Sequence, residues 1–159
     1  MSKHRTHNDI PSNTRATVAG ILNARVADSI DLALLTKQAH WNIRGPNFIA
    51  VHEMLDGLRT ELDTHVDTMA ERVVQLGGQA MGTTQAVAGA TTLPPYPTDL
   101  VAINDHLKAL VERYAAVAAS VRQGINATDE AGDKDTADIL TGYSRALDKA
   151  LWFLEAHQG

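Results

Sequence analysis

Four long segments of the sequence carry apolar residues with the period of an α-helix. The segments are residues 14–41, 47–76, 98–125 and 135–157. The apolar positions of the first segment are Val18, Leu22, Val26, Ile30 and Leu34. Such spacing places side chains along one face of a helix. Four amphipathic helices in a chain of 159 residues predict one all-α domain in which the apolar faces share a core.

Helix-breaking residues separate these segments. Gly45-Pro46 interrupts the pattern after the first segment, and Gly77-Gly78 ends the second. Residues 78–97 form a long connection rich in Gly, Thr and Ala, in which we expect one short helix. Thr98 is the expected N-cap of the third helix. The sequence therefore predicts a four-helix bundle with a long crossover between the second and third helices.

Composition excludes several classes of protein and site. The chain has no cysteine, which excludes disulfides, Cys-ligated zinc, iron–sulfur clusters and thiol nucleophiles. No long apolar run is present, and the polar residues 1–13 lack the apolar core of a secretory signal. We expect a cytoplasmic protein that does not bind membranes, with a flexible polar tail over residues 1–13 and the bundle over residues 14–159.

Four metal-capable side chains lie at i, i+4 spacing in the second segment, His52 with Asp56 and Asp67 with Glu71. At about 100° per residue, the four fall within about 100° of one another around the helix. The apolar stripe of this segment is centred roughly 130° away, so the four side chains point away from their own bundle. An intrachain di-iron site needs Glu-x-x-His pairs aimed at the bundle axis. The sequence contains no such pair, which excludes that kind of site.

The spacing along this helix predicts that two chains share each metal site. Asp56 and Asp67 are eleven residues apart, roughly 16 Å at 1.5 Å per residue, and one small metal centre cannot use both. In one antiparallel register of the helix against its own copy, His52 is level with Glu71 of the second chain. In the same register Asp56 is level with Asp67 of the second chain. A two-fold dimer would carry two equivalent sites, with His40 as a further ligand.

Mixed imidazole and carboxylate ligands indicate which metal ions these sites take. Such sets suit Fe(II) and disfavour soft Cu(I). We expect one or two irons in each site, with Zn(II) or Mn(II) competing for the same ligands. Trp41 follows His40 directly, and we expect it to donate an electron wherever oxidation proceeds by a single-electron step.

Short motifs along nearly the whole chain match those of a known family. The matching residues are 37–42 (KQAHWN), 45, 47–56, 67–72, 75–78, 96–97, 105–107, 113–114, 135–140, 148–149 and 151–153. Together they resemble the Dps family of ferritin-like mini-ferritins, over everything except the first ten to fifteen residues. The resemblance implies a ferritin-like fold and a hollow dodecamer built from two-fold dimers.

The resemblance also implies an activity. Dps proteins oxidise Fe(II) at ferroxidase centres between subunits, often with hydrogen peroxide, and store iron as a ferric mineral, which protects against oxidative damage. The family's ferroxidase residues fall on His40, His52, Asp56, Asp67 and Glu71. The expected activity is therefore that of an oxidoreductase acting on metal ions.

Acidic residues near the start of the fourth helix have two candidate roles. The simpler role is to cap and solvate the helix N-terminus. The resemblance implies that some of them line three-fold pores, where rings of like charge attract Fe(II). The candidates for the pore are Asp133, Asp135 and Asp138.

The resemblance further implies that a basic tail binds DNA in some members of the family. Here the candidate contacts are Lys3, Arg5 and Arg15, and twelve tails together would give salt-dependent phosphate binding. The tail has few cations, however, and the chain has a net charge of -5, which repels DNA. A nucleoid protein that shields DNA physically, with secondary iron chemistry, is the alternative function.

Overall fold

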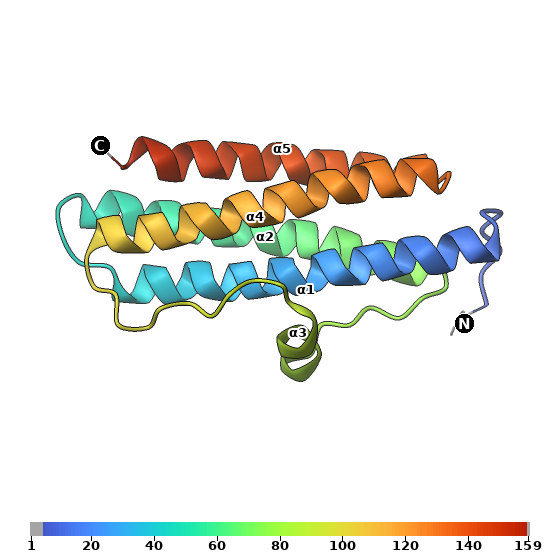
Figure 1. Cartoon of the computed structure of the whole chain (residues 1–159), viewed down its shortest axis with the longest axis horizontal. Coiled ribbons are helices and arrows are strands. Elements are labelled where there is room, and N and C mark those ends of the chain that lie inside the picture. The colour runs from blue at the N-terminus through green and yellow to red at the C-terminus, as the bar shows by residue number, and fades with distance from the viewer. Residues whose placement is uncertain (1–4, 159) are drawn as a thin grey trace.

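The computed structural model describes residues 5–158, which form five helices and no strand (Figure 1). The helices are α1 (Ser12–Asn42), α2 (Phe48–Gln75), α3 (Thr84–Ala90), α4 (Ile103–Glu130) and α5 (Lys134–Ala156). The predicted all-α bundle, the long crossover and the short helix within it are therefore confirmed. Within the described part of the chain, no helix has the length and apolar character needed to cross a membrane.

The long helices form two hairpins, α1 with α2 and α4 with α5. The hairpins pack together through α1 against α4 and α2 against α5. The crossover runs along the outside of α1 and carries α3 (Figure 1). The α1–α2 loop, the start of α4 and the C-terminal end of α5 lie at one end of the bundle, on the left in Figure 1.

The start of α4 differs from the prediction. The helix begins at Ile103 after Ala102, not after Thr98. The chain just before it is fixed by backbone hydrogen bonds to the α1–α2 loop, because Arg44 N donates to Val101 O at 2.9 Å and Ile103 N donates to Arg44 O at 3.2 Å. This pairing competes with helix formation at residues 99–102. A prediction based only on the N-cap preference of Thr98 does not include this contact with the α1–α2 loop.

The predicted tail is partly helical, since α1 begins at Ser12. Residues before it are hydrogen-bonded to the body of the protein. Thr6 Oγ1 donates to Gln75 O at 3.3 Å. Arg15 Nη1 donates to Asn8 O at 2.7 Å and to Ile10 O at 3.0 Å. These contacts hold residues 6–10 against the ends of α1 and α2.

The outer face of α2 and its buried face divide as the helical wheel predicts. Asp56, Asp67 and Glu71 are exposed. The buried apolar residues are Val51, Leu55, Leu58, Leu62, Met69 and Val73. The carboxylates of α2 are therefore available to a second molecule and do not enter their own core.

The apolar stripe of α1 is only partly buried. Val18, Leu22 and Val26 are buried, but Leu34 is 49% exposed and Leu32 is buried in its place. Residues four apart advance by about 40° around a helix, so four such steps rotate the stripe by about 160°. The core face of a helix as long as α1 therefore passes to other residues.

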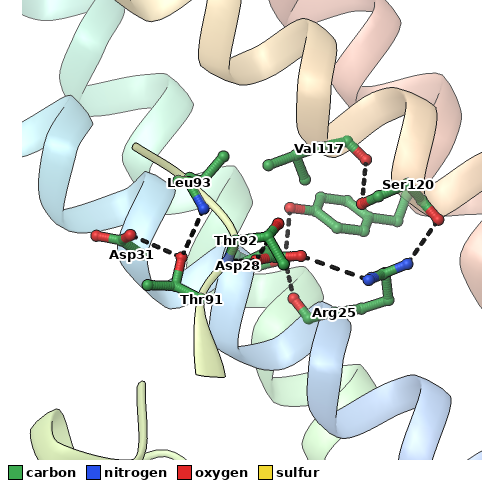
Figure 2. Close-up of polar contacts among 10 residues, drawn as sticks. Arg25, Asp28, Asp31, Thr91, Thr92, Leu93, Val117 and Ser120 are labelled. Carbon is green, nitrogen blue, oxygen red and sulfur yellow. Dashed lines mark hydrogen bonds and ion pairs between the residues drawn. The ribbon is translucent and has the colours of Figure 1, made fainter. Parts of the chain in front are cut away.

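A buried carboxylate attaches the crossover to α1 (Figure 2). Asp28 is 1% exposed and accepts hydrogen bonds from Thr92 N at 2.8 Å and Thr92 Oγ1 at 3.1 Å. Arg25 lies beside it, with Nη2 at 3.5 Å from Asp28 Oδ2, and donates through Nη1 to Ser120 O of α4 at 2.8 Å. Asp28 and Arg25 thus join α1 to the crossover and to α4.

Candidate metal centre

Two histidines from adjacent helices stack where α1 ends and α2 begins. The ring centroids of His40 and His52 are 3.6 Å apart, with an angle of 21° between the planes. His40 is 5% exposed, and Phe48 lies 5.0 Å from the His52 ring. The packing of α1 against α2 therefore brings together two predicted ligands that are twelve residues apart in the sequence.

The two histidines hold each other through reciprocal hydrogen bonds. His40 Nδ1 lies 2.8 Å from His52 O, and His52 Nδ1 lies 3.0 Å from His40 O. A carbonyl oxygen only accepts, so each Nδ1 carries a hydrogen and donates it. In the neutral ring the lone pair then lies on Nε2, which is the atom available to a metal. Each histidine is oriented by the backbone of the other.

Asp56 lies beside this pair and is bound by a lysine. Lys37 Nζ donates to Asp56 Oδ1, and His40 Nδ1 is 3.6 Å from the same oxygen. The hydrogen bond from Lys37, aided by its charge, outweighs burial and holds the pKa of Asp56 below its usual range. Lys37 Nζ also lies 5.9 Å from the centre of the Trp41 ring. Within the subunit, the carboxylate of Asp56 is thus paired with a cation of the protein.

Sequence reasoning did not assign a role to Lys37. The residue lies one helical turn before His40, in the motif that carries the family resemblance. Residues three apart lie on the same face of a helix, so the sequence could have placed Lys37 near His40. Its partner, however, is nineteen residues away on α2. Only the register of α1 against α2 identifies that partner.

The remaining predicted ligands do not join this group within one subunit. Asp67 and Glu71 are exposed on the later turns of α2, beyond Asp63, which Arg59 Nε holds at 2.9 and 3.0 Å. Across residues 5–158, no three His, Asp or Glu side chains converge closely enough to hold a metal ion. The subunit therefore presents one group of two histidines and Asp56, and a separate pair of carboxylates.

Trp41 lies on the surface next to the histidine pair. Its side chain is 67% exposed, and Leu34 and Ile49 are also exposed, at 49% and 61%. These residues lie on α1 and on the first turn of α2. The helices that carry the candidate ligands thus also expose apolar side chains.

The three acids predicted for a pore occupy different environments. Asp133 is 1% exposed, caps α5 by accepting from Thr136 N at 3.0 Å, and pairs with Arg72 Nη2 at 2.8 Å. Its carboxylate is therefore used inside the subunit and is not free to line a pore. Asp135 and Asp138 are exposed and remain the available members of the predicted set.

The cations predicted to bind DNA also differ in their surroundings. Lys3 lies outside the described residues. Arg5 is exposed. The guanidinium of Arg15 binds the carbonyls of Asn8 and Ile10, so it fastens the N-terminal segment and is not a free phosphate-binding group.

Comparison with known proteins gives consistent results across the sequence and the fold. A family model described as a ferritin-like domain matches residues 19–159. The DNA protection during starvation protein of Agrobacterium fabrum is 63% identical over 157 residues, covering 99% of this chain and 97% of that protein. The protein of the same name from Mycolicibacterium smegmatis is 34% identical, covering 88% of this chain and 76% of that one.

Solved structures show the same relationship. DpsC from Streptomyces coelicolor superposes with a TM-score of 0.95 at 31% identity, covering 99% of this chain and 92% of that one. Dps from Mycobacterium smegmatis superposes with a TM-score of 0.92 at 32% identity, covering 96% and 92%. The chain belongs to the Dps family of ferritin-like proteins.

Proposed function

We propose that this protein is a ferroxidase and iron-storage subunit that oxidises Fe(II) at sites formed between two copies of the chain. The observation that carries the proposal is the His40–His52 pair, whose reciprocal hydrogen bonds leave both Nε2 atoms available. A pair of histidines beside Asp56, with open positions for further ligands, suits Fe(II). The family relationship supports the same activity.

A second subunit supplies the carboxylates that this group lacks. Asp67 and Glu71 lie on the same exposed face of α2 as Asp56, yet too far along the helix to reach it. In the antiparallel two-fold arrangement, Asp67 and Glu71 of the partner subunit lie level with Asp56 and His52. Trp41, which follows His40, and Ile49, about one turn before His52, are exposed apolar side chains that the second subunit would cover.

Hydrogen peroxide is the oxidant that we propose. Two Fe(II) ions lose one electron each, and one hydrogen peroxide molecule takes up the two electrons and two protons to give two water molecules. Carboxylate ligands stabilise Fe(III) over Fe(II). Lys37 Nζ must move away from Asp56 Oδ1 before that oxygen can bind iron. Zn(II) and Mn(II) compete for the same atoms.

Trp41 is placed to supply an electron in single-electron steps, and replacing it with Phe is expected to increase hydroxyl-radical escape.

The proposed assembly is a dodecamer that stores ferric mineral inside. Fe(II) reaches the interior through three-fold pores lined by the exposed Asp135 and Asp138. The change Asp138→Asn is expected to slow iron uptake, whereas Glu155→Gln, at the far end of α5, leaves it unchanged. Equal uptake rates in both variants would remove Asp138 from the proposed route.

The sharing of sites between subunits can be tested by mixing two inactive variants. One carries His52→Ala and Asp56→Asn, and the other carries Asp67→Asn and Glu71→Gln. After co-assembly at equal amounts, half of the dimers are mixed and each has one intact site, so about a quarter of the sites recover. The readout is Fe(II) bound anaerobically and oxidised on adding hydrogen peroxide.

A matched control uses a carboxylate away from α2. Asp148 is exposed and pairs with Arg122 at 2.8 Å, so Asp148→Asn is expected to keep the stoichiometry of the unmodified protein. If the mixture recovers nothing while each parent assembles normally, the intersubunit site is refuted. Unaltered oxidation in the His52/Asp56 double variant would refute the ligand assignment itself.

DNA binding is a second candidate function, favoured by the relatives named DNA protection during starvation proteins. We propose that any binding depends on residues 1–13 and weakens steeply with salt. A gel shift at low and high salt, repeated with a chain lacking residues 1–13, tests it. Binding that persists without the segment would assign the contact to another surface.

A further inference from the structure

The loop between the two site histidines is held by a distant part of the chain. Arg44, in the α1–α2 loop, forms an isolated parallel bridge with Ala102, the last residue before α4. Arg44 N donates to Val101 O at 2.9 Å, and Ile103 N donates to Arg44 O at 3.2 Å. The crossover therefore ends by pairing with the loop that separates His40 from His52.

The sequence of this loop permits its turn but provides no side-chain cap for α2. Gly45 has φ 139° and Asn47 has φ 61°, and Asn47 precedes α2 without a side-chain cap hydrogen bond. Gly and Asn adopt positive φ more readily than other residues, so the loop sequence permits this turn, and the backbone bonds to residues 101 and 103 fix its position. His52 lies in the second turn of α2, so the direction in which the chain enters α2 affects the placement of its ring.

His106 fixes the segment that pairs with the loop. The residue is 2% exposed. Its Nε2 lies 3.0 Å from Leu100 O and therefore donates to it, and its Nδ1 lies 2.8 Å from Tyr96 Oη and accepts the hydroxyl hydrogen. Tyr96 is itself held by Arg113, whose guanidinium is 5.2 Å from the ring centre. Both ring nitrogens of His106 thus bind the last residues of the crossover.

Burial favours the neutral forms of His106 and Tyr96. Burial lowers the pKa of His106, against smaller opposing contributions from Leu100 O and Asp105. Burial raises the pKa of Tyr96 to about 12, opposed by Arg113. The groups facing the His106 ring are then an uncharged phenol and a carbonyl, with Asp105 and Arg113 as the nearby charges on α4.

We propose that His106 is a positioning residue for the His40–His52 pair. His106 binds Leu100 O, the adjoining Val101 O and Ile103 N bind the backbone of Arg44, and Arg44 lies in the loop that connects the two site histidines. The inference rests on the proposed function, because it assigns His106 a role in metal binding. His106 does not contact the metal ligands and acts through the backbone.

The experiment compares three variants of the full-length assembled protein. His106→Leu fills the space with an apolar side chain and removes both hydrogen bonds, whereas His106→Gln retains an amide N–H that can donate to Leu100 O. Leu110→Ala, one turn along the buried face of α4, destabilises the core and keeps both hydrogen bonds of His106. Hydrogen exchange of peptides covering residues 42–50 reports the loop, and calorimetric titration with Zn(II) reports the site.

His106→Leu is expected to speed exchange of the loop and to weaken Zn(II) binding by about tenfold, the lower end of the effect of groups that orient metal ligands. His106→Gln is expected to restore most of the loop protection and most of the Zn(II) affinity. Leu110→Ala is expected to leave Zn(II) affinity unchanged and to speed exchange of the loop no more than that of the rest of the protein. Unchanged loop exchange in His106→Leu, or faster exchange with unchanged Zn(II) affinity, would overturn the positioning role. The proposed function fails separately, if His52→Ala binds Zn(II) as tightly as the unmodified protein.

Discussion

Removing the buried charge of Asp133 gives the most direct measure of how the second hairpin is attached to α2. The Asp133 side chain is fully buried and its partner Arg72 is 8% exposed, with 2.8 Å between Oδ1 and Nη2. Arg72 Nε also donates to Thr136 Oγ1 at 3.0 Å. The change Asp133→Asn keeps a good N-cap for α5, because Asn caps as well as Asp. It removes the counter-charge to Arg72 together with one acceptor oxygen, since Thr136 Oγ1 donates to Asp133 Oδ2 at 2.7 Å.

Breaking one side of a buried ion pair costs about 3–5 kcal/mol, since the remaining charge stays buried. For a chain of this size, about 2–4 °C of melting temperature is lost per kcal/mol, so Asp133→Asn is expected to lower the melting temperature by about 6–20 °C. The matched control is Asp135→Asn, whose carboxylate is 3.9 Å from the same Nη2 but 84% exposed. Exposed pairs contribute about 0–1 kcal/mol.

The assay is thermal unfolding at one fixed protein concentration, since assembly adds to apparent stability.

The dependence of stability on acid pH gives a second readout. Burial disfavours the charge of Asp133, but hydrogen bonds from Thr136 and Arg72 outweigh it and keep the pKa below the usual value of 3.8. The stabilisation is therefore complete above that value and is lost as the pH falls below it. Equal melting temperatures for the two variants, or an identical acid response, would refute the buried-pair argument.

Two further perturbations test other parts of the structure. Lys37→Met removes the cation bound to Asp56 and is expected to tighten Zn(II) binding several-fold in calorimetric titration; weaker binding would show that Lys37 assists the metal. Gly78→Ala would place a Cβ 2.9 Å from Val73 Cγ1 and is expected to cost about 1–3 kcal/mol in urea unfolding. Gly142→Ala, with no atom within 4 Å of its Cβ, is expected to stabilise α5 by about 0.5–1 kcal/mol. If both variants lower the free energy of unfolding, the contact with Val73 does not explain the effect of Gly78→Ala.

The sequence predicts features that depend on residues within one helix. The exposed face of α2 is one, because the angles of Asp56 and Glu71 relative to Leu55 follow from the helical period alone. The N-cap of α5 is another, since Asp133 precedes a regular helical pattern. Such features need no information about other parts of the chain.

Features that depend on contacts between distant segments could not be predicted in this way. The start of α4 is set by Arg44 and His106, not by Thr98. The Lys37–Asp56 pair and the reciprocal bonds of the histidines require the register of α1 against α2. The residues were visible in the sequence, but their partners depend on tertiary packing, which local patterns do not encode.

The buried carboxylate of Asp28 bears on the order in which a newly made chain can fold. Covering this charge before its donors arrive would leave it in an apolar interior at a cost of several kcal/mol. The helix α4, which Arg25 joins to this site through Ser120 O, follows Thr92 in the sequence. During synthesis from the N-terminus, the donor therefore leaves the ribosome before α4. The order of the chain thus supplies Thr92, the partner of Asp28 that α1 itself does not provide, before α4 is complete.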